Sequence, residues 1–245
     1  MYELPLSPAV LATVALGGFI QGLAGFGAGL VAVPLLMLQL PAGVAVPMFS
    51  LLATLGSAMN VLHLRHAVNF RPLLLLLGGY VIGAPLGLLY LTKASQTWVM
   101  AGLGAFLTLY ALYALSGRRP DYRWLREQRL ALGMCSGALG AAFSTNGPPV
   151  ILHVAAQDWD TERQKAILSL YFLLSGLLTS AVHAIGGLLD QEVLLATAVA
   201  VLPLILGVSL GIAVYRRLSA HNYRRLTFLL VLTMGVLLIT RVFFV

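Results

Sequence analysis

The chain carries no Asp, Glu, Lys or Arg between Glu3 and Arg65, and this uncharged run limits its fold more than any other feature. The run is far longer than one helix needs to cross a hydrocarbon core of roughly 30 Å. Of all residues, 60% are hydrophobic and only 9% are charged, which is too little charge to solvate a soluble domain of this size. The sequence therefore predicts an all-α polytopic membrane protein in a lipid bilayer.

Two apolar segments, residues 8–38 and 128–157, are too long for a single crossing. Each has helix-breaking residues at its centre, because glycine and proline disfavour the interior of a helix. The two clusters are Gly25-Phe26-Gly27-Ala28-Gly29 and Ser144-Thr145-Asn146-Gly147-Pro148-Pro149. We expect each segment to form a broken, re-entrant helical hairpin. The remaining apolar segments predict transmembrane helices over about 46–63, 72–92, 97–116, 164–186, 191–215 and 224–243.

Basic residues gather in connectors at 63–71, 118–129 and 216–225, and such connectors of membrane proteins face the cytoplasm. All of them face one side only if each hairpin enters and leaves the membrane on the same side. The alternative, in which every apolar segment crosses fully, places the second and third connectors on opposite sides. The formal net charge of +7 is thus explained by membrane orientation, and we expect no nucleic-acid partner.

Motifs of the first half recur in the second half. Gly83-Ala-Pro-Leu-Gly87 matches Gly207-Val-Ser-Leu-Gly211, and Ser50 to His63 aligns with Ser169 to His183 with one gap. Each half then holds a hairpin and an odd number of crossings, which makes the halves inverted repeats, as in many secondary transporters. Chance similarity between apolar helices is the alternative. The predicted first repeat, cytoplasmic connector and second repeat cover residues 1–117, 118–127 and 128–245.

The two breaks are the best candidates for a binding site. Backbone groups freed by a broken helix cannot face lipid, and the start of the second half-helix offers N–H groups with a partial positive charge. Such helix starts bind oxyanions. The candidate substrate-binding residues are the break residues, two buried carboxamides and one histidine at membrane depth: Gln21, Gly25, Gly27, Gly29, Asn60, Ser144, Thr145, Asn146, Gly147 and His183.

The alternative is that these glycines serve helix packing and that the prolines cap a half-helix. We prefer the packing role for the glycines spaced four residues apart outside the breaks, which are Gly18, Gly22, Gly83, Gly87, Gly207 and Gly211.

No pattern of paired carboxylates, zinc ligands or a nucleophile with its base converges in the sequence. We therefore expect no catalytic residue, no metal ligand and no cofactor. No Asp or Glu lies in the middle of a predicted crossing, which disfavours proton coupling through a buried carboxylate. Proton coupling through a histidine, a co-transported cation and facilitated diffusion are the alternatives left open. A homodimer is also left open. The hypotheses that compete with a secondary transporter are a membrane-embedded enzyme and a non-transporting assembly subunit.

Three sequence features together resemble the sulfite exporter TauE/SafE family. They are Gly22-x-x-Gly25-x-Gly27-x-Gly29-x-x-x-Val33-Pro34, the basic connector from His63 to Arg71, and Asn146-Gly147-Pro148-Pro149. The resemblance spans nearly the whole chain. It implies a permease of the bacterial inner membrane that moves a small anion, such as sulfite, thiosulfate or an organosulfonate, by alternating access.

Two departures from the family pattern concern the breaks themselves. Ala28 stands where a third consecutive glycine is common, and Ser144-Thr145-Asn146 stands where many relatives have another glycine. A sulfur-free organic anion is therefore an alternative cargo.

Overall fold

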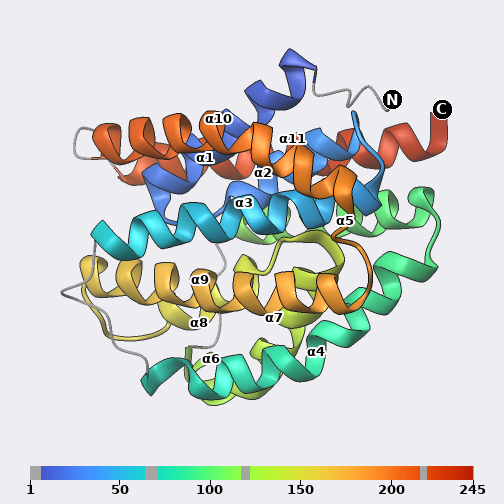
Figure 1. Cartoon of the computed structure of the whole chain (residues 1–245). Helices are drawn as coiled ribbons and strands as arrows, with labels where there is room; N and C mark the ends of the chain where they lie inside the picture. Colours follow the sequence, from blue (N-terminus) through green and yellow to red (C-terminus); the bar gives the residue numbers. More distant parts are fainter. Residues whose placement is uncertain (1–6, 64–70, 117–121, 216–219, 245) are drawn as a thin grey trace.

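The computed structural model describes residues 7–63, 71–116, 122–215 and 220–244. Within these ranges the chain forms helices and no strand (Figure 1), which confirms the all-α fold class. Five of the described helices are long and apolar enough to cross a membrane, in agreement with a multi-pass membrane protein. They are Ala42–His63 (α3), Arg71–Lys93 (a 3-10 turn, Arg71–Leu73, followed by α4, Leu74–Lys93), Gln96–Leu115 (α5), Glu162–Ile185 (most of α9, Thr161–Ile185) and Gln191–Val214 (most of α10, Gln191–Tyr215). The last described helix is α11, Ala220–Phe244.

The first long apolar segment is broken into α1 and α2, which span Pro8–Ala24 and Ala28–Met37. The break lies at Gly25 (φ 78°) and Gly27 (φ 86°), whose left-handed backbone glycine adopts without steric cost. The Gln39 amide beyond the end of α2 donates to the Thr13 hydroxyl near the start of α1 (3.2 Å), so the chain reverses direction at the break. The two arms therefore lie side by side, with the glycines at the tip.

The second long apolar segment is broken into α7 and α8, which span Arg129–Phe143 and Gly147–Ala155. Ser144 ends α7 with φ 49° and is the one non-glycine residue with positive φ in the described part of the chain. The Ser136 hydroxyl in α7 donates to the main-chain carbonyl of Asn146 (2.5 Å). That bond holds the start of α8 against the arm that precedes it.

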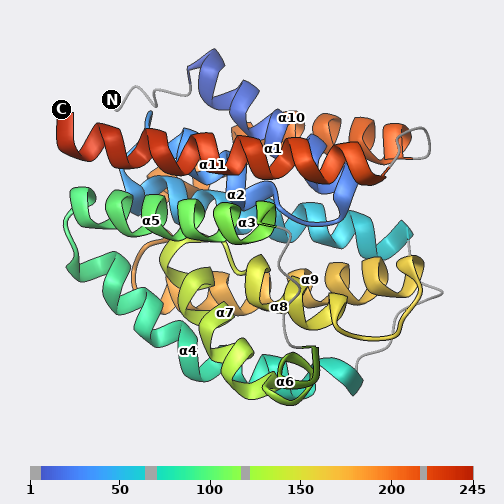
Figure 2. The same cartoon turned by 180° about the vertical axis from the view of Figure 1, so that it is seen from behind.

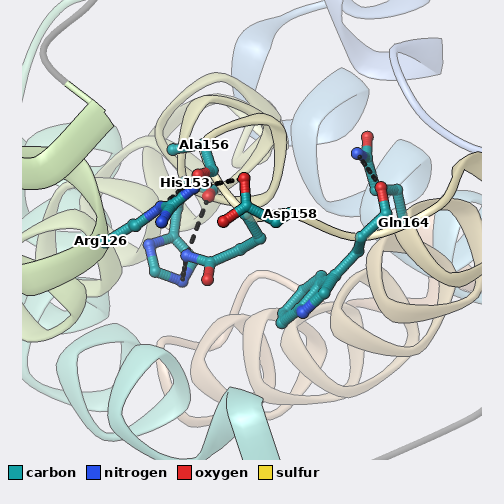
Figure 3. A network of polar contacts seen from close by, with 7 residues as sticks. Arg126, His153, Ala156, Asp158 and Gln164 are labelled. Atoms are coloured by element: carbon teal, nitrogen blue, oxygen red, sulfur yellow. Dashed lines mark hydrogen bonds and ion pairs between the residues drawn. The ribbon is translucent and has the colours of Figure 1, made fainter.

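The C-terminal end of the second broken segment, at the end of α8, is bound to a short helix, α6 (Tyr122–Glu127). Figure 3 shows Arg126 reaching from α6 to the Ala156 carbonyl and to the Asp158 carboxylate, with the latter ion pair at 2.7 Å. His153 Nδ1 lies 2.7 Å from the main-chain carbonyl of Leu125. The predicted connector 118–127 is thus partly helical, which the sequence reasoning did not predict.

Helices of one half pack on helices of the other half. α1 lies along α10 and α4 lies along α7, while α3 contacts α9 and α5 contacts α11 (Figures 1 and 2). Glycines allow the first two pairs to approach closely. A Cβ atom would lie 2.6 Å or less from a carbonyl oxygen of the partner helix at Gly18, Gly22, Gly83, Gly87, Gly207 and Gly211. The packing role predicted for these six glycines is confirmed.

Helix α3 begins at Ala42, earlier than the predicted start at residue 46, and continues through Pro47. The side chain of Gln96 explains the difference, because its Oε1 accepts from the Ala42 N–H (2.7 Å) and so caps the helix from the start of α5. Because Gln96 is distant in sequence, the residues around Ala42 do not indicate that the helix starts there. Residues 64–70, 117–121 and 216–219 hold much of the basic connectors and lie outside the described residues, so the membrane orientation stays a prediction.

Candidate functional site

The two breaks touch at the centre of the molecule. A Cβ atom placed on Gly29, at the start of α2, would lie 2.4 Å from the main-chain oxygen of Ser144 and 3.5 Å from the Thr145 hydroxyl oxygen. A cavity lies beside this contact, and residues of α3 and α9 line its other sides. Its lining consists of Gln21, Phe26, Gly27, Ala28, Gly29, Leu30, Ser50, Ala53, Ser57, Ser144, Thr145, Asn146, Gly147, Phe172, Gly176 and Thr179.

The cavity is small and partly polar. The volume in which the centre of a water molecule fits is about 50 Å³. One water molecule needs roughly 10–15 Å³ by the same measure. The space therefore suits a small polyatomic ion with a few water molecules.

Most hydroxyl groups around the cavity already donate to main-chain carbonyls. The Ser144 hydroxyl donates to Val46 (2.8 Å), which ties the second break to α3. The same pattern holds, at 2.8 to 2.9 Å, for Ser50 to Pro47, Ser57 to Ala53, Thr145 to Phe143 and Thr179 to Ser175. Because a hydroxyl has one proton, these side chains shape the cavity but have little donor capacity left for an anion.

Main-chain N–H groups are the donors that remain. No side chain caps the start of α2, where Ala28 and Gly29 supply N–H groups that intrahelical bonding leaves unsatisfied. The start of α8 offers fewer, since Pro148 and Pro149 follow Gly147 and have no N–H. The glycine-rich break therefore contributes more N–H groups than the proline-rich one.

Gly25 contributes in a different way from Gly27 and Gly29. Its N–H donates to the Gln21 carbonyl (2.7 Å) and so ends α1, and the residue does not line the cavity. It therefore has no free N–H for a ligand, whereas the sequence reasoning assigned all three glycines that role. Gly25 instead packs against the side chains of Lys165 and Ser169 from α9.

The two buried carboxamides have different positions. Gln21 lines the cavity, and its Nε2 donates to the Ala53 carbonyl (2.9 Å) and to the Ser57 hydroxyl oxygen (2.8 Å). The Gln21 Oε1 is buried and has no hydrogen-bond partner among the described residues. Asn60 lies behind this group and donates to the main-chain carbonyl of Gln21 (3.1 Å). Asn60 thus positions α1 against α3.

Asn146 lines the cavity and connects the second break to α9. Its Nδ2 donates to the Ser175 hydroxyl oxygen (2.7 Å). Its main-chain carbonyl accepts from Ser136, which in turn accepts from the Tyr171 hydroxyl (2.8 Å). This chain of bonds fixes the amide at the cavity wall.

His183 lies behind the cavity wall and is fully buried. Its Nε2 is 2.8 Å from the Ala141 carbonyl, which can only accept, so Nε2 carries the proton. Its Nδ1 faces the Ser50 hydroxyl at 3.3 Å. His183 therefore links α9 to α7 and α3.

The structure gathers most of the predicted site residues at one cavity. Gly25, Asn60 and His183 lie outside its lining, and the residues that line it are Gln21, Gly27, Gly29, Ser144, Thr145, Asn146 and Gly147. Sequence reasoning missed Phe26 and Phe172, which line the cavity, and Lys165, which contacts Gly25 outside the lining. The lysine had a usable signal, since it is the one lysine within the predicted crossing 164–186.

The family model described as Sulfite exporter TauE/SafE matches residues 10–238 of the 245-residue chain. No curated protein and no solved structure matches the chain.

Proposed function

Because the chain belongs to the sulfite exporter TauE/SafE family, whose members are membrane transporters and not enzymes, we propose that it moves a small sulfur anion through the cavity between the two breaks. The cargo class is sulfite, thiosulfate or an organosulfonate. The observation that carries the proposal is the contact of Gly29 with Ser144, which brings two helix starts to one small cavity. A coupling proton or cation and a homodimer, both left open by the sequence, are not part of this proposal.

The anion is held mainly by main-chain N–H groups. Ala28 and Gly29 donate from the start of α2, Gly147 donates from the start of α8, and the Asn146 amide adds a side-chain donor. The partial positive charge at both helix starts favours an anion without a lysine in the cavity lining. Removal from water strengthens these interactions, because the surrounding helices have a low dielectric constant.

Alternating access follows from two inverted halves, residues 1–117 and 128–245, that move against each other around the cavity. The helix contacts support this proposal, since α1 pairs with α10 as α7 pairs with α4, which are equivalent positions in the two halves. The broken segments then enter from opposite sides of the membrane and meet at mid-depth.

The direct test uses purified protein with sulfite, thiosulfate, taurine and sulfoacetate, measured by calorimetric binding and by flux into lipid vesicles. We expect saturable binding and protein-dependent flux of at least one of these anions. Flux of sulfur-free organic anions alone would indicate the alternative cargo. Absence of flux for every anion would contradict transport and favour an assembly subunit.

Replacing Asn146 by alanine should weaken anion binding about tenfold, because the cavity loses an amide donor and Ser175 loses its partner. Asn146→Asp should weaken it further, since a carboxylate of the same shape repels the anion. The calorimetric dissociation constant measures both effects. Gln157→Ala is the matched control, as it removes an amide beyond the far end of α8. Equal affinity of all variants would make Asn146 a purely structural residue.

A further inference from the structure

Each break packs against the beginning of the long helix of the other half, and the two contacts differ in chemistry. At one end of the cavity, Ser144 donates to the Val46 carbonyl of α3. The other contact lies outside the cavity lining: a Cβ atom on Gly25 would lie 3.3 Å from Lys165 Cε and 3.4 Å from the Ser169 hydroxyl oxygen of α9. The alignment of Ser50 with Ser169 makes Val46 and Lys165 equivalent positions, so a lysine replaces an apolar residue at one contact only.

The Ser169 hydroxyl is unsatisfied. The residue is fully buried, and its oxygen has no hydrogen-bond partner among the described residues. Its counterpart Ser50 is also buried but donates to the Pro47 carbonyl (2.8 Å). A buried hydroxyl without a partner is costly, which indicates that Ser169 faces a ligand or water that occupies this position during function.

Lys165 lies inside the membrane-capable part of α9. Ionisable residues in such segments are costly and commonly mark an ion pathway. The spacing of Lys165, Ser169, Phe172 and Gly176 places them on one face of α9, and the last two line the cavity. At 1.5 Å per residue, Lys165 is about 10 Å from Phe172 along the helix axis. The face therefore leads from the cavity toward the start of α9.

We propose that Lys165 and Ser169 form a second, transient anion position on the route between the cavity and the end of the protein where α9 begins. This inference rests on the proposed function and takes the same class of ligand, a small oxyanion or sulfonate. The ammonium group draws the anion to this end, and the Ser169 hydroxyl donates to it as it passes the tip of the first broken segment. The equivalent contact beside Val46 has no lysine, and the Ser50 hydroxyl there already donates to the Pro47 carbonyl, so the route is electrostatically asymmetric.

The test compares vesicle flux for wild type, Lys165→Gln, Lys165→Arg and Arg163→Gln, with the anion that wild type transports and at concentrations below saturation. Arg163 is the matched control, because it is exposed on the same helix and stacks on Trp159 (4.9 Å to the ring centre). We expect flux to fall at least tenfold in Lys165→Gln and to become less sensitive to salt concentration. Flux should stay near the wild-type rate in Lys165→Arg and Arg163→Gln.

Ser169→Ala gives an independent readout. Removal of an unpartnered hydroxyl should leave the thermal unfolding midpoint unchanged or higher while flux falls severalfold, whereas Ser50→Ala should lower the midpoint because it loses a hydrogen bond. The inference alone is overturned if wild type transports and Lys165→Gln and Ser169→Ala match it in rate and salt dependence. A wild-type protein without flux overturns the proposed function, and this inference with it.

Discussion

Gly29→Ala should abolish most anion binding, because the added Cβ atom would lie 2.4 Å from the Ser144 main-chain oxygen. A methyl carbon and a carbonyl oxygen cannot lie this close together, so the two breaks must separate. The N–H groups of Ala28 and Gly29 then move away from Gly147, and hydrogen bonds weaken steeply when their geometry is lost. We expect the calorimetric dissociation constant to rise by roughly tenfold to a hundredfold, which corresponds to about 1.4–2.8 kcal/mol.

Gly27→Ala is the matched control for this variant. Its Cβ atom meets only Ile20 Cγ2, at 3.9 Å, but the backbone is left-handed at φ 86°. Strain of this kind costs roughly 1–2 kcal/mol. Gly27→Ala should therefore lower the unfolding midpoint and leave affinity closer to wild type, whereas Gly29→Ala should lower affinity most. Wild-type affinity in Gly29→Ala would show that the contact between the breaks does not shape the binding site.

Gly87→Ala should destabilise the protein by about 1–3 kcal/mol or more, because its Cβ atom would lie 2.1 Å from the Ala138 carbonyl oxygen. Helix α4 would have to move away from α7 over the whole length of their contact. The thermal unfolding midpoint in detergent measures the loss. In Gly83→Ala, one turn away, the Cβ atom would lie 2.0 Å from the Met134 carbonyl oxygen. Combining the two substitutions should lower the unfolding midpoint further.

Gly78→Ala is the control on the same helix, since nothing lies within 4 Å of its Cβ position. Alanine is the better helix former, so this variant should be neutral or slightly stabilising. An equal unfolding midpoint for Gly78→Ala and Gly87→Ala would contradict the close packing of α4 and α7.

The broken helices and the packing glycines could be predicted because their causes are local. A cluster such as Gly25 to Gly29 disfavours helix wherever it occurs, and glycines spaced four residues apart share one helix face in any context. The positions of both breaks, and the gathering of their residues at one cavity, follow from these local preferences together with the need to satisfy freed backbone groups.

What could not be predicted depends on partners distant in sequence. The start of α3 is fixed by Gln96, and the hydroxyl of Ser144 is engaged by Val46. A serine beside a break reads as an available donor until the carbonyl that takes its proton is known. Lys165 stands out in the sequence as the one lysine of its predicted crossing, but its contact with Gly25 could not be predicted because that contact joins the two halves of the chain.

The central claim is that the contact between the two breaks forms the binding site of a small-anion transporter. Flux of radiolabelled sulfite or thiosulfate into vesicles, compared among wild type, Gly27→Ala and Gly29→Ala at equal amounts of folded protein, tests it most directly. We predict saturable flux in wild type, substantial flux in Gly27→Ala and at least a tenfold loss in Gly29→Ala. Equal flux in Gly29→Ala and wild type, or no flux of any anion in wild type, would contradict it.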